Sequence, residues 1–266
     1  MKVMAALCAL ATFLTGAADT PPSPMLEPNG PWVVEGSEGL CVLTRSYGPD
    51  AAKITVGLQP MFSFPMMELF IITPDRLTGR RAGNATLSLG GAPLRGEYIS
   101  VDMAAGRRFT RIQLAATAME QIKAAQTMTV TARPVSITVH LVRTAAGATA
   151  LDRCERQLLQ SWQVDPDAMT PERAPTPLNP EQRFTPERYP QEALAQGLQG
   201  RVIAVVQVGA DGIANGCHVV ASAGQTLDDA TCINARRVRF RPGKDATGHA
   251  TPSIYLLPVR WVLPFG

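Results

Sequence analysis

A proline-rich segment divides the chain and sets the first limit on its fold. Seven prolines follow Trp162 with charged residues and hardly an apolar side chain between them: Pro166, Pro171, Pro175, Pro177, Pro180, Pro186 and Pro190. Proline fixes φ and restricts the residue before it, so such a stretch is extended and semi-rigid. We therefore expect a linker over residues 165–185, an N-terminal domain over residues 30–164 and a C-terminal domain over residues 186–266.

The composition is that of a protein with a buried core. Of 266 residues, 45% are hydrophobic and 18% are charged, which excludes a disordered chain and a mainly membrane-embedded one. The 25 basic and 22 acidic residues leave a formal charge of only +3. A nucleic-acid binder concentrates a much larger excess on one face, so we expect no nucleic-acid partner.

The first residues have the pattern of a secretory signal peptide. Met1 and Lys2 form a positive start, residues 3–14 are almost wholly apolar, and residues 15–18 are small. The apolar run is shorter than the roughly 20 residues that a membrane-spanning helix needs. We expect a signal peptide over residues 1–18, cleaved after Ala18 or Ala17, and export. An uncleaved segment that anchors the chain in the inner membrane is the alternative.

The cysteine count agrees with export. Removal of residues 1–18 takes Cys8 away and leaves Cys41, Cys154, Cys217 and Cys232, an even number for an oxidising compartment. Four cysteines allow three connectivities. Because the proline-rich segment separates them into two pairs, we predict the disulfides Cys41–Cys154 and Cys217–Cys232.

The sequence pattern of the N-terminal domain predicts a β-rich α+β fold. Alternating or β-branched runs predict strands at residues 40–45, 53–58, 66–73, 85–89, 109–114, 128–132 and 136–142. Residues 115–125 have helical composition, and residues 150–162 place Leu151, Cys154, Leu158 and Trp162 on one helical face. Cys154 is therefore predicted to point inward, where a bridge to Cys41 would attach the second helix to the sheet.

The sequence pattern of the C-terminal domain predicts a smaller α+β unit with the order helix, β-hairpin, helix and final strand. A short helix over residues 189–197 has Pro190 at its start and Gly197 at its end. Strands at residues 201–208 and 213–221 flank Asp211-Gly212, a favoured hairpin turn. A helix begins near Thr226, residues 240–242 stop it, and residues 254–263 form the last strand.

The motifs of this unit resemble the C-terminal domain of the TonB family over residues 186–263. The pattern reads Tyr-Pro-x-x-Ala-x-x-x-Gly-x-x-Gly, Asp-Gly, Leu-Asp-x-Ala and Arg-Arg-x-Arg-Phe-x-Pro. Its residues here are Tyr189, Pro190, Ala193, Gly197, Gly200, Asp211, Gly212, Leu227, Asp228, Ala230, Arg236, Arg237, Arg239, Phe240 and Pro242. The sequence departs from the family pattern at Cys232, usually an apolar residue, and at Val238, usually tryptophan.

The resemblance implies a periplasmic binding domain that supports TonB-type transmembrane transport or envelope organisation. Its partner would be an outer-membrane receptor or another envelope protein, whose extended peptide adds as a strand beside the last strand. The resemblance assigns that edge to Ile254, Tyr255, Leu256, Leu257, Val259, Arg260, Trp261 and Val262. Pro258 lacks a donor and so fits an edge, yet it deletes one hydrogen bond to a docked peptide. An unpaired last strand also invites homodimerisation by strand exchange.

A full energy transducer is the alternative within the family. It needs a membrane helix and a long proline-rich span, whereas the first apolar segment here looks cleavable and a folded domain occupies the middle of the chain. A membrane-anchored transducer would follow if the N-terminal segment is not cleaved.

The sequence shows no pattern of an enzyme. None of His140, His218 and His249 lies in a nucleophile–base pattern, and no phosphate-binding loop is present. We therefore expect a non-enzymatic protein with no catalytic residue, no metal and no cofactor. Metal binding by Cys217, His218 and Cys232 is an alternative to the second disulfide. A ligand carrier or enzyme that uses the N-terminal domain, with the apolar residues 61–67 lining a pocket, also stays open.

A basic run follows the last predicted helix: Arg236, Arg237, Arg239, Arg241 and Lys244. Positive side chains near a helix C-terminus complement its dipole. The same run could instead meet an acidic partner peptide, anionic lipid or cell-wall polymer.

Overall fold

The computed structural model describes residues 24–37, 40–61, 66–74, 78–133, 135–162, 164–168, 174–178, 180–245 and 247–263. The predicted signal peptide and its cleavage site lie outside the described residues, and so do residues 62–65 of the apolar segment. Within the described ranges no helix is both long and apolar enough to cross a membrane.

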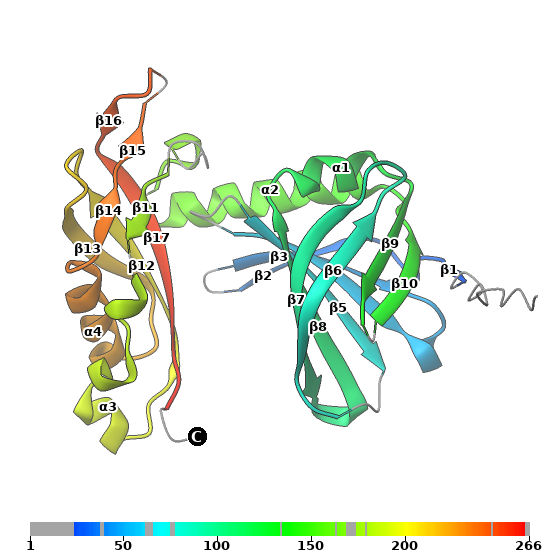
Figure 1. Cartoon of the computed structure of the whole chain (residues 1–266), viewed down its shortest axis with the longest axis horizontal. Helices are drawn as coiled ribbons and strands as arrows, with labels where there is room; N and C mark the ends of the chain where they lie inside the picture. Colours follow the sequence, from blue (N-terminus) through cyan, green and yellow to red (C-terminus); the bar gives the residue numbers. More distant parts are fainter. Residues whose placement is uncertain are drawn as a thin grey trace, which may run out of the picture.

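The N-terminal part is built on one large curled sheet (Figure 1). Its order is β1-β10-β9-β6-β7-β8-β5-β4-β3-β2, and every neighbouring pair is antiparallel except β1 with β10. The strands are β1 (Met25–Leu26), β2 (Val33–Ser37), β3 (Leu40–Tyr47), β4 (Ile54–Pro60), β5 (Met66–Pro74), β6 (Arg81–Ser88), β7 (Leu94–Met103), β8 (Arg107–Ala115), β9 (Thr127–Ala132) and β10 (Val135–His140). Short 3₁₀ turns η1 (Asp50–Ala52) and η2 (Ala104–Gly106) join strands.

Two helices cover one face of this sheet: α1 (Ala118–Ala124) and α2 (Thr144–Ser161). The face beneath them holds the core, because alternate residues of each strand point to it; in β3 these include Cys41, Leu43 and Tyr47. Helix α2 packs closely on β2 and β3: a Cβ at Gly147 would lie 3.0 Å from the Trp32 side chain. The predicted Cys41–Cys154 disulfide is present, with Cα atoms 6.1 Å apart, and it attaches α2 to β3.

The predicted α+β class of the N-terminal part is confirmed, and each of the seven expected strands corresponds to an observed one. Strands β1, β2 and β7 were not predicted, and α2 begins six residues before the predicted start at 150. In β7 only Tyr98 and Ser100 are buried, so the strand has little apolar alternation to detect. The first turns of α2 consist of small residues and Thr, which carry no apolar periodicity.

The C-terminal part contains the expected helix, hairpin, helix and final strand (Figure 1). The second helix ends at Ala235, before the predicted stop at residues 240–242, and residues 239–241 form a strand instead. Its elements are α3 (Gln191–Ala195), β12 (Gly200–Val208), β13 (Ala214–Ala221), α4 (Gln225–Ala235), β14 (Arg239–Arg241), β15 (Gly243–Lys244), β16 (Ala250–Thr251) and β17 (Ser253–Trp261). The main sheet has the order β13-β12-β17, with both pairings antiparallel. Helices α3 and α4 lie on one face of it over a core that includes Val202, Leu227 and Tyr255. The predicted Cys217–Cys232 disulfide joins β13 to α4, with Cα atoms 5.6 Å apart.

Part of the predicted linker lies against the C-terminal unit. Strand β11 (Thr176–Leu178) pairs with β14, Thr176 opposite Arg241, and the turns η3 (Pro166–Ala168), η4 (Pro180–Gln182) and η5 (Pro186–Arg188) flank it. Pro177 is tolerated because β11 has a single neighbour in a two-stranded ladder. The proline content therefore predicted an extended backbone in the linker, but it did not predict that this backbone would pair with another strand. The boundaries of the linker and of both domains stay predictions.

Glu155 on α2 predicts an unusual pH dependence of stability. It lies one helical turn from each of the buried residues Leu151 and Leu159, and among the described residues its Oε1 has no hydrogen-bond partner. Burial raises the pKa of Glu155 to about 8, and the nearby Asp152 adds to the rise. The pKa of Glu155 is higher in the folded protein than in the unfolded chain, so the carboxyl does not lower the free energy of unfolding in acid. It lowers that free energy increasingly as pH rises from about 4.5 to about 8.

We predict that Glu155→Gln raises the melting temperature little at pH 4.5 and progressively more up to pH 8.5. The penalty that it removes grows by at most about 1.4 kcal/mol per pH unit. Thermal unfolding across that pH range measures the effect, with the exposed Glu181→Gln as control. An equal gain at all pH values would contradict a buried, uncharged Glu155.

Candidate functional site

Strand β17 is an end strand of its sheet. Only β12 pairs with it in the described part of the chain, through nine consecutive residue pairs without a register shift. The opposite end strand, β13, is shorter, is irregular in register at two points and is bonded to α4 through Cys217. Bulges twist an edge away from a flat partner, so β17 is the better edge for strand addition.

The predicted edge residues divide between the two faces of the sheet. Tyr255, Leu257, Val259 and Trp261 belong to the core under the helices. Trp261 is fixed there, because its Nε1 donates to Thr231 Oγ1 at 2.9 Å and its ring meets Tyr189 edge-on at 5.2 Å. Ile254 and Leu256 lie on the opposite face with Arg260, and Val262 follows the strand with 54% of its surface exposed.

Pro258 indicates which way the backbone groups of β17 point. Proline has no N–H, so within a paired strand its nitrogen belongs on the side away from the neighbour. Backbone direction alternates along a strand, and Ile254, Leu256, Arg260 and Val262 are in step with Pro258. The outward N–H groups near the end of β17 are therefore those of Arg260 and Val262. At its beginning the strand is flanked by β15, where Gly243 N donates to Ser253 Oγ at 3.3 Å.

The end of helix α2 covers the other face of the C-terminal sheet. Leu159, Trp162 and Val164 form one buried cluster with four residues of that sheet: Ile203, Val205, Ala221 and Leu256. Figure 1 shows α2 reaching from the curled sheet to the C-terminal unit. Both faces of the three-stranded sheet are thus occupied, which leaves its edges as the backbone surface that a partner can reach.

A cleft of about 590 Å³ lies between the N-terminal sheet and the end of β17. Residues of β4, β5 and β8 line one side and residues of β12 and β17 line the other; the charged ones are Glu68, Arg111, Arg201 and Arg260. Sequence reasoning placed Arg260 on the edge strand but did not single out Glu68, Arg111 or Arg201. Each is a polar residue alternating with apolar ones in a strand, which is the usual pattern of a solvated face.

A second cleft, of about 620 Å³, lies at the other end of the same sheet face. It includes Val205, Gln207 and Ile254 from the strands, His218 from β13, and Lys244 beside β16. Its floor is largely formed by residues that the sequence assigned to strands. No charged cluster of one sign gathers there, since Lys244 stands beside Asp165 and Asp245.

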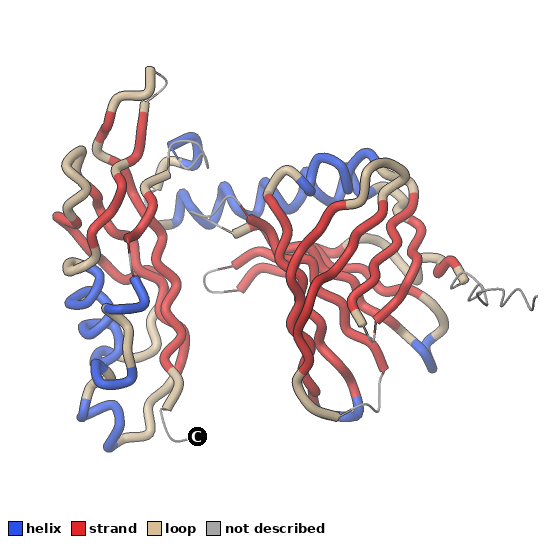
Figure 2. The backbone as a smooth tube through the Cα atoms, viewed as in Figure 1, coloured by secondary structure: helices blue, strands red, loops and turns tan. Residues whose placement is uncertain are grey.

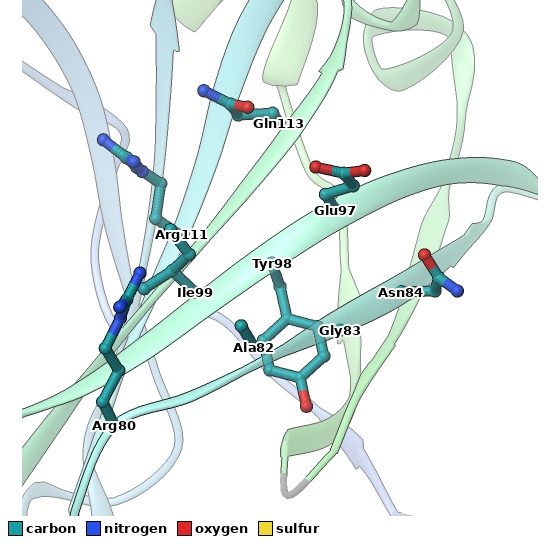
Figure 3. A pocket seen from close by; sticks show the side chains of 9 residues that line it. All are labelled: Arg80, Ala82, Gly83, Asn84, Glu97, Tyr98, Ile99, Arg111 and Gln113. Carbon is teal, nitrogen blue, oxygen red and sulfur yellow. The ribbon is translucent and has the colours of Figure 1, made fainter.

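The N-terminal domain has a small pocket of its own, of about 250 Å³, on β6, β7 and β8. Figure 3 shows the Tyr98 ring beside Gly83, with Arg80 and Arg111 on one side and Glu97 and Gln113 above. The Tyr98 hydroxyl donates to the Arg133 carbonyl, so it is already occupied. Pockets for small ligands usually enclose about 300–1,000 Å³, so this one is below the usual range for a carrier or enzyme site.

The histidines and cysteines do not assemble into a metal site in the described structure. Cys217 and Cys232 are bonded to each other, which corrects the alternative in which they ligate a metal with His218. His140 Nδ1 lies 3.0 Å from Glu27 Oε2 at the surface, and His249 Nδ1 lies 2.6 Å from Thr247 Oγ1. The basic run begins just after α4, which ends at Ala235, and continues into β14 and β15.

The geometry defines a small α+β domain whose last strand lies at the end of its sheet. In comparison with known families, residues 185–263 match the model described as Gram-negative bacterial TonB protein C-terminal. The chain therefore carries a TonB C-terminal domain, as the motifs predicted. Comparison with curated proteins and with solved structures gives no match.

The family gives the coarse class of function. TonB C-terminal domains interact with outer-membrane receptors in general, and their proteins are non-enzymatic energy transducers or interaction proteins. The domain indicates a TonB-type, transport-related role in the envelope or periplasm.

We predict that Trp162→Ala uncouples the two parts of the molecule. Trp162 is 8% exposed and lies in the cluster that joins α2 to the C-terminal sheet. Truncating a buried tryptophan typically costs about 3–5 kcal/mol, and here the loss falls on the contact between the parts. Calorimetry should change from one transition to two, and hydrogen exchange should rise at the end of α2 and in β12.

Leu151→Ala is the matched control, because Leu151 lies on the same helix within the N-terminal core. It should lower the stability of the N-terminal part without splitting the transition. A single, merely lowered transition for Trp162→Ala would contradict a joining role for this cluster.

Proposed function

We propose that this chain is a non-enzymatic periplasmic interaction protein that binds an extended partner peptide by strand addition at the edge of β17. Its domains follow the predicted boundaries, with a signal peptide cleaved near Ala18. The partner is an outer-membrane receptor or another envelope protein. This binding supports TonB-type transmembrane transport or organisation of the envelope.

The observation that carries the proposal is the unbroken nine-residue pairing of β17 with β12 at the end of a sheet. A regular strand with one neighbour presents a row of N–H and C=O groups to an incoming strand. The match of residues 185–263 to the TonB C-terminal model supports this use of the edge, because domains of that family bind receptors.

The rigidity of the edge also supports the proposal. On the helix side, Trp261 is held by Thr231 and Tyr189; on the other side, Leu256 packs in the cluster with α2. A strand fixed on both faces loses little conformational freedom when a peptide binds. Affinity would then come mainly from the backbone, and selectivity from the residues that border the second half of the strand.

The proposal predicts opposite effects of two substitutions at the open edge. Val262→Pro removes an outward N–H without touching the ladder to β12, whereas Pro258→Val adds one. A single hydrogen bond contributes about 0.5–1.5 kcal/mol, so Val262→Pro should weaken peptide binding about 2- to 12-fold and Pro258→Val should strengthen it by a similar factor. Val262→Thr keeps the N–H and is the matched control.

The probe is a set of random twelve-residue peptides displayed on phage and selected on the full chain with both disulfides intact. Fluorescence anisotropy of the selected peptides then compares the variants. Enrichment of peptides that bind Val262→Pro more weakly and Pro258→Val more tightly than the wild-type chain supports strand addition at β17. No enrichment, or peptides that bind Val262→Pro as well as Val262→Thr, would overturn it.

A further inference from the structure

The cleft beside the end of β17 carries an excess of positive charge. Three guanidinium groups, of Arg111, Arg201 and Arg260, share it with one carboxylate, that of Glu68. Glu68 is already engaged, since its Oε1 lies 3.3 Å from Arg111 Nη1. Arg201 and Arg260 form no direct ion pair within the described residues, although Glu68 is near enough to act electrostatically on Arg201. The single carboxylate of Glu68 therefore faces three guanidinium groups, and the cleft keeps an excess of positive charge.

Arg201 and Arg260 are direct cross-strand neighbours. They are paired in register between β12 and β17, and both follow the alternation that faces away from the helices, because the adjacent Val202 and Val259 belong to the helix-side core. Side chains at such positions stand about 4.5–5.5 Å apart at Cβ, and like charges there destabilise a sheet.

Both arginines are exposed, and Arg201 is also partly enclosed by protein. The Arg201 side chain reaches solvent in the cleft, yet protein surrounds its guanidinium closely enough that burial lowers its pKa, while the nearby Glu68 opposes the shift. The exposed pair Arg236 and Arg237 beyond α4 lies outside the cleft. Arg201 and Arg260, by contrast, are paired in strand register and line the cleft opposite residues of the N-terminal sheet.

A strand added to β17 would send alternate side chains into this cleft. The outward N–H groups of Arg260 and Val262 lie at its border, and a residue placed opposite Arg260 points to the same face as Arg260. Figure 2 shows that the last strand runs along the side of the C-terminal unit nearest the curled sheet and ends near the marked C-terminus. The side chain that best fits there is one that neutralises two guanidinium groups, which a carboxylate does through charge-assisted hydrogen bonds.

We propose that the interdomain cleft is an acid-selective subsite, in which Arg201 and Arg260 bind a carboxylate of the peptide strand that pairs with the end of β17. The inference rests on the proposed strand addition and adds the chemistry of the partner: an extended segment with Asp or Glu where it passes Arg260. It also gives the N-terminal domain a part in binding, because Glu68 and Arg111 form the opposite wall and limit what can enter.

The test uses the peptides selected on the full chain. Asp or Glu should be enriched at one end, and replacing that residue by Asn or Gln should weaken binding at least tenfold at low salt. The difference should shrink at 0.5 M NaCl, where charges are screened. The double variant R201Q/R260Q should lose the preference for the acidic peptide while it keeps its affinity for the amide peptide.

Two further variants control the result. R236Q/R237Q removes the same charge outside the cleft and should keep the acid preference. Glu68→Gln removes the competing carboxylate and should increase the preference for the acidic peptide severalfold. The double variant R201Q/R260Q should melt at or above the wild-type temperature, because it relieves the repulsion between the two arginines.

The outcomes separate the two proposals. Some peptides could bind Val262→Pro more weakly and Pro258→Val more tightly, yet show no acid preference or keep that preference in R201Q/R260Q. This result would overturn the subsite and leave strand addition supported. Peptides whose affinity is unchanged by Val262→Pro and Pro258→Val would overturn strand addition and, with it, this subsite. A lower melting temperature of R201Q/R260Q would contradict the like-charge argument.

Discussion

The last turn of α2 belongs to two cores at once, and the geometry of the binding edge depends on it. Leu158 packs against both the N-terminal core and the cluster shared with the C-terminal sheet, while Trp162 lies in the shared cluster. Four residues before Leu158, Cys154 ties the helix to β3. An 18-residue helix is about 27 Å long, and α2 acts as a strut that is fixed beyond its middle by the Cys154 disulfide and at its C-terminal end by apolar packing.

This strut determines what the C-terminal sheet can offer to a partner. By covering the middle of the face that bears Val205 and Leu256, it leaves accessible the two clefts at the ends of that face and the edge of β17. It also sets the distance between the end of β17 and the outer face of the curled sheet. The packing of Trp162 against the C-terminal sheet therefore helps to place Arg260 opposite Glu68 across the cleft.

The sequence predicted those features that are encoded locally. The Cys217–Cys232 disulfide and the order of elements after Tyr189 follow from spacing or motifs within a short window. The Cys41–Cys154 disulfide, 113 residues apart, followed instead from the proline-rich segment that divides the cysteines into two pairs, and the edge strand followed from the family resemblance. The contact of Trp162 with the other domain was not predicted. The apolar face of a helix indicates that its residues are buried, but it does not indicate which surface covers them. The proline-rich segment also hid the pairing of Thr176 with Arg241, since propensity does not report which backbone groups find partners.

The candidate subsite was invisible in the sequence for a related reason. Arg201 and Arg260 are 59 positions apart, and the strand register alone brings them opposite each other. Each looks like an ordinary polar residue on a strand, and the basic run at Arg236 gave the stronger sequence signal. Charge patterning reveals clusters along the chain, whereas a cross-strand pair becomes visible only when the register is known.

Pro258 distinguishes a partner peptide from a second copy of this chain. If two β17 strands paired antiparallel about their central residue, Leu257, then Pro258 of each copy would lie opposite Leu256 of the other, and neither proline could donate a hydrogen bond. A peptide without proline loses one donor there, not two. Proline and charge on an exposed edge are common devices against self-association, and here both occur within three residues. Pro258 and Arg260 thus disfavour strand exchange between copies while leaving the edge open to an acidic strand.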